Sequence, residues 1–290
     1  MAYSRASSLL CWLCFHSSFG RKAEAIYPTH TGARRSFGEA SAPFVFLSMA
    51  EDTFDVLILI GRPASGKSEI IDYLTQLPDH TRRERFHIAQ LEVLDDFPIL
   101  WSWFEDDDIL SKKFGLPRLH SDEEGYFKYK ELWQVLIERL NLDYAKKVRE
   151  HASYHDHTTI LIEFSRGSEH GGYGQAFQHV SDEILKRAGV VYVRVPFEES
   201  LRKNRRRFNP DKPDSILEHG LTDEKMERLY RNDDWVAVAP GASGRLSVRG
   251  QSVPYAVFPN EDDVTTGKAD QLAVRLESVL GKLWELYEQK

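Results

Sequence analysis

The chain has little cysteine, with only Cys11 and Cys14 among its 290 residues. The two form a C-x-x-C, a spacing that can indicate redox or metal chemistry. They lie in an apolar leader with no second pair and no βαβ context, so we assign no site to them. The absence of cysteine from residue 15 onward excludes a disulfide framework in the main body of the protein.

Long apolar runs and an excess of positive charge are also missing. No stretch of about 18 apolar residues occurs, so the sequence predicts no transmembrane helix and no membrane partner. The formal net charge is -7, whereas a general nucleic-acid binder is expected to carry a basic face. We therefore expect no nucleic-acid partner. The length allows one large domain or two small ones, and no internal repeat is visible.

Residues 61–68 have the sequence GRPASGKS, which fits G-x-x-x-x-G-K-[ST], the phosphate-binding P-loop. Before it, residues 54–60 form a short apolar, β-branched run that predicts a buried strand. After it, apolar residues at helical spacing continue up to Pro78. A strand, a glycine-rich turn and a helix are the context that the motif requires. The sequence therefore predicts a nucleotide-binding loop.

The fixed positions of the motif have physical roles. Gly61 and Gly66 let the backbone approach phosphate oxygens without a Cβ atom in the way. The N–H groups at the start of the helix favour an anion. Lys67 can reach the β- and γ-phosphates, and Ser68 can hold Mg²⁺. We therefore expect ATP and Mg²⁺ as cofactors, bound by Gly61, Arg62, Pro63, Ala64, Ser65, Gly66, Lys67 and Ser68.

A carboxylate ends the apolar run 158–163. An apolar strand of this kind is the Walker-B-like pattern that places an acid next to the Mg²⁺ of a bound nucleotide. The pattern alone is common, and it carries weight here because a P-loop precedes it. We therefore expect Glu163 next to the Mg²⁺. Asp95 and Asp96, which follow a predicted strand at about 86–94, could hold a polar acceptor or act as a base.

Further elements follow from apolar periodicity. We expect strands at 190–195 and 253–258, helices at about 129–151, 221–235 and 268–287, and a short hairpin within 241–251. Strands thus alternate with helices, which predicts an α/β fold of three layers, with a parallel sheet of about five strands and helices on both faces. The segment 97–108 combines aromatic and acidic residues. It either belongs to the site or forms a surface acidic loop over an aromatic core patch.

Five cations lie within residues 202–207, where they repel one another. One explanation is a solvated basic helix end, since cations suit a helix C-terminus. The other is a set of arginines that face a polyphosphate and stabilise charge on the transferred group. Arg202, Arg205 and Arg206 are spaced i, i+3 and i+4 and so share one helix face. We favour the second explanation.

On these residues the chain resembles the P-loop small-molecule kinases, the group of nucleoside, nucleoside-monophosphate and shikimate- or gluconate-type kinases. Residues 54–68 match the ATP-binding start of the family. Residues 161–166 (LIEFSR) are similar to its third-strand pattern, an acid followed by an arginine. Residues 191–207 resemble the strand and helix that lead into an arginine-bearing lid, which implies a lid segment near 199–235. No subfamily pattern for the acceptor is present, and the insert at about 97–150 is longer than a minimal kinase needs.

The resemblance implies a P-loop NTPase fold and transfer of the γ-phosphate of MgATP to a small-molecule acceptor, a nucleoside or nucleotide among the options. Glu163 would either orient Mg²⁺ or take the acceptor proton, with Asp95 or Asp96 as the rival base. Arg166 would hold the acceptor, and the arginines of the lid would exclude water. The residues implied in catalysis are Lys67, Glu163, Arg166, Arg202, Arg205 and Arg206, with Ser68 and Glu163 at the metal.

A different class of function is a nucleotide-dependent switch or ATPase that acts on a protein partner. The guanine-reading pattern N/T-K-x-D is absent, which speaks against a GTPase. The order of elements and the arginine cluster favour the kinase. Whether the protein is a monomer or a homodimer stays open.

Residues 1–48 differ from the rest in being rich in serine and poor in acidic residues. We expect a disordered extension or an unused upstream start, with Met49 as the first residue, ahead of an organelle transit peptide. A short signal segment at 9–15 is a further option, but export suits ATP chemistry poorly. Residues 49–290 would then form a single kinase-like domain in the cytoplasm, or in an organelle matrix if a transit peptide precedes it.

Overall fold

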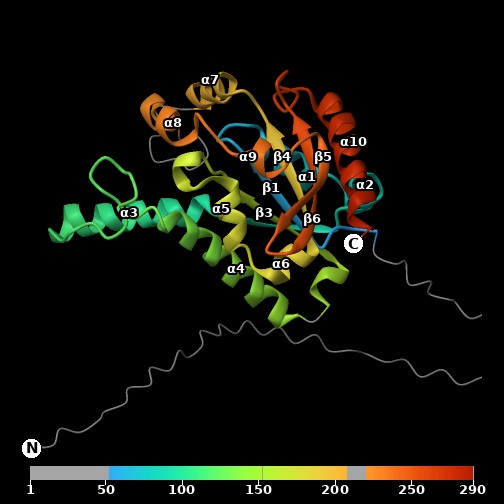
Figure 1. The fold of residues 1–290 in the computed structure, drawn as a ribbon, viewed down its shortest axis with the longest axis horizontal. Helices are drawn as coiled ribbons and strands as arrows, with labels where there is room; N and C mark the ends of the chain where they lie inside the picture. Colours follow the sequence, from blue (N-terminus) through green and yellow to red (C-terminus); the bar gives the residue numbers. More distant parts are fainter. Residues whose placement is uncertain (1–51, 152, 208–219, 290) are drawn as a thin grey trace, which may run out of the picture. The chain divides into compact units, whose positions relative to one another are not determined.

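The computed structural model describes residues 52–151, 153–207 and 220–289, so the predicted extension at 1–48 lies outside the described residues. The described part contains one six-stranded sheet (Figure 1). Its strands are β1 (Val56–Gly61), β2 (Gln90–Asp95), β3 (Thr158–Phe164), β4 (Ala188–Arg194), β5 (Ser243–Val248) and β6 (Gln251–Pro259). The order across the sheet is β2-β3-β1-β4-β6-β5.

Helices connect the strands and flank the sheet (Figure 1). They are α1 (Lys67–Gln76), α2 (Asp79–Phe86), α3 (Phe97–Phe114), α4 (Leu132–Glu150), α5 (Gly172–His179), α6 (Asp182–Arg187), α7 (Phe197–Arg207), α8 (Asp223–Tyr230), α9 (Trp235–Val238) and α10 (Ala269–Tyr287). Two 3-10 turns, Tyr154–Asp156 and Ser168–His170, precede β3 and α5. No helix among the described residues is long and apolar enough to cross a membrane.

The strands β2, β3, β1, β4 and β6 run parallel to one another. β5 pairs antiparallel with β6 at one edge of the sheet. The turn between β5 and β6 is Arg249-Gly250, with φ of 46° and 81°. Positive φ at both positions is what a two-residue hairpin turn requires. The expected α/β class and parallel sheet are therefore confirmed, and the hairpin adds an antiparallel sixth strand to the five that the sequence predicted.

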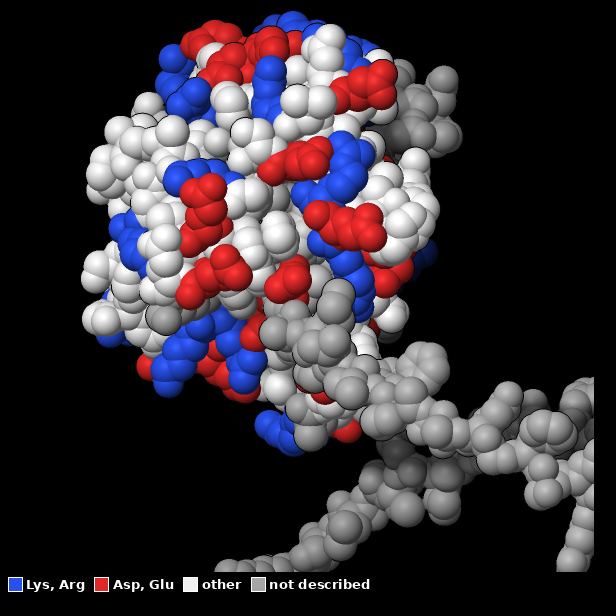
Figure 2. Space-filling model, turned by 90° about the vertical axis from the view of Figure 1, so that its right-hand side faces the viewer, with Lys and Arg blue, Asp and Glu red and all other residues white. Residues whose placement is uncertain are grey.

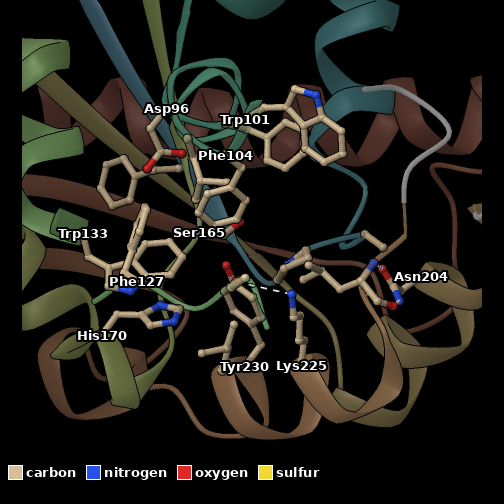
Figure 3. A pocket seen from close by; sticks show the side chains of 18 of the residues that line it. Asp96, Trp101, Phe104, Phe127, Trp133, Ser165, His170, Asn204, Lys225 and Tyr230 are labelled. Atoms are coloured by element: carbon tan, nitrogen blue, oxygen red, sulfur yellow. Dashed lines mark hydrogen bonds between the residues drawn. The ribbon is translucent and has the colours of Figure 1, made fainter. Parts of the chain in front are cut away.

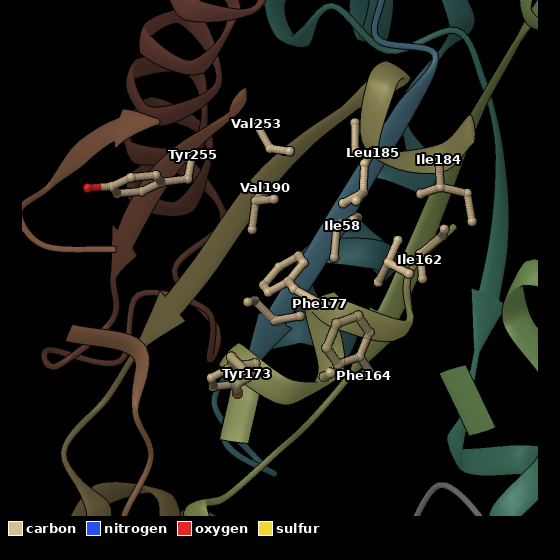
Figure 4. Packing of buried hydrophobic residues seen from close by; sticks show 14 of the residues in the cluster. Ile58, Ile162, Phe164, Tyr173, Phe177, Ile184, Leu185, Val190, Val253 and Tyr255 are labelled. Carbon is tan, nitrogen blue, oxygen red and sulfur yellow. The ribbon is translucent and has the colours of Figure 1, made fainter. Parts of the chain in front are cut away.

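The sheet is buried on both faces because successive side chains of a strand point to opposite sides. Val56, Ile58 and Ile60 of β1 pack in one core cluster with α4, α5 and α6 (Figure 4). Leu57 and Leu59 pack in a second cluster with α1, α2 and α10. These two clusters make the three layers and hold the ends of the parallel strands in fixed positions.

The segment 97–108 is helical, so its interpretation as a surface acidic loop is wrong. It belongs to α3, an 18-residue helix with proline in its first turn and Gly115 as its C-cap at φ 64°. Asp107 is fully buried within the acidic run, where it accepts hydrogen bonds from the backbone N–H groups of residues 119–121. In Figure 1, α3 extends away from the sheet.

A smaller difference concerns the expected helix at 221–235, which is divided into α8 and α9. Before β3, His155 is buried and lies 3.0 Å from the hydroxyl of Tyr144. Charges of both signs are interspersed over the face shown in Figure 2. The described residues therefore form no continuous basic strip on this face (Figure 2).

Candidate functional site

The loop 61–68 lies at the carboxyl end of β1 and leads into α1. Parallel α/β sheets bind ligands at this edge, where the connections on either side of a strand diverge. β1 meets that condition, because its neighbours are β3 on one side and β4 on the other. The fold thus positions the predicted loop at the edge of the sheet where a ligand site is expected.

Two positions of the loop require glycine because other protein atoms lie very close to them. A Cβ atom on Gly61 would lie 2.6 Å from the carbonyl oxygen of Val193. A Cβ atom on Gly66 would lie 2.6 Å from Asn260 Nδ2 and from Thr265 Oγ1, and the φ of Gly66 is 109°. A larger residue at either position would force the loop away from its present path.

The side chain of Asn260, just after β6, fixes the position of the loop 61–68. Its side-chain amide donates to the carbonyl oxygen of Ser65 at 2.8 Å and to Thr265 Oγ1 at 2.9 Å. Its side-chain oxygen accepts from the N–H of Val264 at 3.0 Å. The residue is fully buried. No local sequence pattern indicated this role of Asn260, because its partner lies 195 positions away.

Lys67 lies among loop carbonyls and the end of β3. Its ammonium donates to the carbonyl oxygens of Gly61 at 3.3 Å and Arg62 at 3.1 Å, and to Ser165 Oγ at 2.9 Å. It lies 3.6 Å from Glu163 Oε1. The structure therefore brings together Lys67 and Glu163, which the sequence had proposed as parts of one site.

Asp95 and Glu163 are register partners at the ends of β2 and β3. Burial, followed by the charges of Glu163 and Asp96, raises the pKa of Asp95 to about 7. Burial also raises the pKa of Glu163, and the charge of Lys67 opposes that rise. Two carboxylates that share a buried site do not ionise with equal ease, which leaves one of them able to take up a proton near neutral pH.

Asp96 and Arg166 form a buried ion pair with 2.6 Å between Oδ2 and Nη1. Burial raises the pKa of Asp96 in spite of Arg166. Arg166 also donates to the carbonyl oxygens of Trp133 at 2.8 Å and Ser165 at 2.7 Å. Its guanidinium lies 5.3 Å from the ring centroids of Trp133 and Phe164. Arg166 is 1% exposed, so in this structure it holds the cavity wall together.

A cavity of about 1400 Å³ opens in front of these residues. Ligand pockets usually measure about 300–1,000 Å³, so there is room for a nucleotide and a second small molecule. One half is bounded by Gly66, Lys67, Ser68, Glu163 and Ser165. The other half is aromatic and includes Phe104, Phe127, Trp133 and Tyr230 (Figure 3).

The basic residues of α7 separate into two groups. Arg202 pairs with Glu199 at 2.7 Å and Asp263 at 3.4 Å, and Arg205 pairs with Asp223 at 2.6 Å; neither arginine lines the cavity. Lys203, Arg206 and Arg207 do line it. The arginines that were expected to share one face therefore face different surroundings. Residues 208–219 of the expected lid lie outside the described residues.

His170 lines the cavity and was missed by the sequence analysis. Its ring stacks on Trp133 with 3.8 Å between centroids and meets Tyr230 edge-on at 5.1 Å. The N–H of Gly167 donates to its Nδ1 at 3.2 Å, so the proton of the neutral ring is on Nε2. Burial lowers the pKa of His170 to about 3, which keeps the ring neutral. No local pattern in the glycine-rich segment indicated this contact.

The side chain of Arg62 links the loop to the aromatic half of the cavity. It donates to the carbonyl oxygens of Val195 at 3.1 Å and Tyr230 at 3.0 Å, and it pairs with Asp233 at 2.8 Å. Any contact of this residue with phosphate would therefore come from its backbone. Pro63 and Ala64 line the cavity beside it, whereas Ser65 is buried.

Comparison with known proteins gives structural matches only. No family model and no curated protein matches the chain. A sugar kinase from Janibacter sp. HTCC2649 is 12% identical with a TM-score of 0.37, over 79% of this chain and 95% of that one. APE1195 is 16% identical with a TM-score of 0.34, over 79% and 98%. TT1252 from Thermus thermophilus is 17% identical with a TM-score of 0.31, over 80% and 98%. All three TM-scores are below 0.5, so the functional argument rests on the chain's own residues.

Proposed function

We propose that this protein is a P-loop phosphotransferase that moves the γ-phosphoryl group of MgATP to a hydroxyl group of a small-molecule acceptor. The observation that supports this most is the position of Lys67. It is the lysine of a P-loop motif that begins at the end of β1, lies 3.6 Å from Glu163 and borders a cavity large enough for two ligands. This combination suits phosphoryl transfer, in which positioning and charge stabilisation do most of the work.

The residues of the loop fit a polyphosphate. Ser65 Oγ is buried and has no hydrogen-bond partner among the described residues. Gly61 and Gly66 have no room for a Cβ atom, so the loop keeps this path only with glycine at these two positions. Lys67 now donates to loop carbonyls, and these are weak partners that a phosphate oxygen would replace with a charge-assisted contact.

Ser68 and Glu163 fit a Mg²⁺ that is held partly by phosphate. The described residues contain no group of three His, Cys, Asp or Glu side chains that could hold a metal ion alone. Mg²⁺ in such sites usually keeps several waters and takes one or two protein ligands besides the substrate phosphates. The bound ion would neutralise charge on the transferred group.

We assign the acceptor base to Asp95. Asp96 is engaged by Arg166 and Glu163 lies beside Lys67, so Asp95 is the carboxylate of the three with no cation within ion-pair distance among the described residues. A pKa of about 7 suits a group that must take a proton at neutral pH. In this proposal Arg206 faces the transferred group, while Arg202 and Arg205 hold α7 in place through their acidic partners.

The test is ATP consumption by the full chain with Mg²⁺, against nucleosides, nucleotides, sugars and other small metabolites. We expect one acceptor to raise turnover and to be recovered phosphorylated, with loss of both in Lys67→Ala. Arg205→Ala is the matched control, because it removes a cation of the same molecule outside the cavity. ATP binding without a phosphorylated product for any acceptor would refute the kinase and favour a nucleotide-dependent switch.

A further inference from the structure

One face of α3 is exposed along most of the helix, which extends away from the sheet in Figure 1. The residues of this face are Pro98, Ser102, Glu105, Asp106, Ile109, Lys112 and Lys113, with Leu116 just beyond the helix end. Ile109 is 48% exposed and Leu116 is 53% exposed. Scattered apolar residues are normal on a protein surface. The feature that distinguishes this face is the pattern of charges around Ile109.

The charges around Ile109 form two sets, one acidic and one basic. Glu105 and Asp106 precede it by about one helical turn, and Lys112 and Lys113 follow it by about one turn. Because seven residues are close to two turns of a helix, Glu105 and Lys112 lie along one flank of the face. Asp106 and Lys113 lie along the other flank for the same reason. The four charges are therefore arranged symmetrically about Ile109.

These charges have few partners within their own chain. Among the residues that the structure describes, neither Asp106 nor Lys113 makes an ion pair or a side-chain hydrogen bond. Lys112 pairs with Asp108 at 2.6 Å, but Asp108 has a second cation, Arg118, at 2.5 Å. Lys112 can therefore turn toward another acid without leaving Asp108 unpaired.

The helix dipole accounts for only part of this arrangement. Cations are favoured in the last turn of a helix, where Lys112 and Lys113 lie. Acids are favoured in the first turn, but the first turn of α3 contains none. Glu105 and Asp106 lie in the middle of the helix, where the dipole has little effect. Their position beside Ile109 needs a different explanation.

A second α3 that runs in the opposite direction complements this pattern. A two-fold axis at Ile109 places Glu105 of each helix beside Lys112 of the other, and Asp106 beside Lys113. The two copies of Ile109 then meet at the axis and cover each other from water. A second helix that ran in the same direction would set acids against acids and lysines against lysines. The charges therefore select the antiparallel orientation.

We propose that this protein forms a two-fold symmetric dimer through this face of α3, with the two helices antiparallel about Ile109. The partner is a second copy of the same chain, because the charge pattern is complementary to itself. This interface does not depend on the proposed phosphotransferase activity. The 18 residues of α3 span only about 27 Å, which gives a smaller contact than the standard interface of about 1,600 Å². The dimer should therefore dissociate at micromolar concentrations.

The first test is sedimentation velocity on the full chain at concentrations from about 1 to 200 µM, a range that brackets a micromolar dissociation constant. We expect the protein to change from monomer to dimer as its concentration rises. The dimer should weaken in about 1 M salt, where the Debye length falls to about 3 Å. A monomer at every concentration would overturn the proposal.

The second test reverses the charges in two variants of the full chain. One carries Glu105→Lys with Asp106→Lys, and the other carries Lys112→Glu with Lys113→Glu. Each variant alone loses four attractions between the helices. Because a surface ion pair is worth a factor of about 2–5, we expect the dissociation constant of each variant dimer to rise by about tenfold or more. An equimolar mixture of the two variants sets lysines opposite acids again and should dimerise.

The matched control carries Glu285→Lys with Glu288→Lys at the exposed end of α10. It changes the net charge by the same amount as the first variant, and it should dimerise as the unmodified chain does. Circular dichroism of each variant shows that it is folded. A dimer that persists in either charge-reversed variant, or a mixture of the two folded variants that stays monomeric, would refute pairing through α3.

Discussion

Asp95→Asn is predicted to stabilise the protein more as the pH rises. The pKa of Asp95 is about 7 in the folded chain, against an ordinary value of 3.8. A carboxyl group whose pKa is raised by folding contributes stability that is fully present below pH 3.8 and is lost as the pH rises to 7. Asparagine stays neutral throughout. It also keeps a side-chain oxygen for the N–H of Phe97, which Asp95 now accepts at 2.9 Å.

The size of the effect follows from the interval between the two pKa values. Each pH unit inside it is worth about 1.4 kcal/mol, so the roughly 1.5 units between pH 5.5 and 7 correspond to about 2 kcal/mol. Urea unfolding at pH 5.5 and pH 8 should show the advantage of Asp95→Asn growing by about that amount. Activity of the variant should be lost at both values if Asp95 is the base.

Asp223→Asn is the matched control for that experiment. Asp223 is exposed, and its hydrogen bond to Arg205 lowers its pKa, so neutralising it should bring no gain in stability at pH 8. An advantage of Asp95→Asn that is the same at pH 5.5 and pH 8, or is absent, would refute the argument that burial and neighbouring acids raise the pKa of Asp95.

Three further substitutions test other parts of the site. Asp96→Asn leaves Arg166 buried without its counter-charge, which should cost about 3–5 kcal/mol in urea unfolding, whereas Arg205→Met at the surface should change little; equal effects would contradict the buried pair. Asn260→Ala should raise the KM for ATP about tenfold with a smaller change in kcat, because a lost buried hydrogen bond is worth about 1–3 kcal/mol; an unchanged KM would show that the loop holds its shape alone. Gly66→Ala should abolish binding of a fluorescent ATP analogue, since its Cβ would lie 2.6 Å from Asn260, and normal binding would refute the close-approach argument.

Local patterns predicted the parts of the fold that depend on neighbouring residues. The strand before residue 61, the glycine-rich loop and the helix after it lie together in the sequence, and they form as expected. Short apolar runs predicted the buried parallel strands β1, β3 and β4. α3 was missed because an acidic run usually indicates a solvent-exposed segment. Asp107 is instead buried, and it accepts hydrogen bonds from backbone N–H groups 12 to 14 positions further along the chain.

The walls of the cavity could not be predicted in the same way. Phe104, Phe127, Trp133 and Tyr230 come from four segments, and no spacing within one segment relates them. Asn260 reaches the loop from 195 residues away. Such contacts follow from the order of strands in the sheet, which a single sequence does not specify. The residues of the candidate site that belong to the P-loop motif could therefore be predicted from the sequence. The residues that distant elements bring together could not.

The adjacency of Asp95 and Asp96 explains how one strand end serves two purposes. Successive side chains near a strand end point to different sides, so the two carboxylates meet different partners. Asp96 joins Arg166, 70 positions away, and ties the end of β2 to the residues that follow β3. Asp95 stays beside Glu163. Three acids at two neighbouring strand ends would repel one another if all were charged. Arg166 and Lys67 each offset one of them, and the third, Asp95, has a pKa that is raised by burial and by the two neighbouring acids.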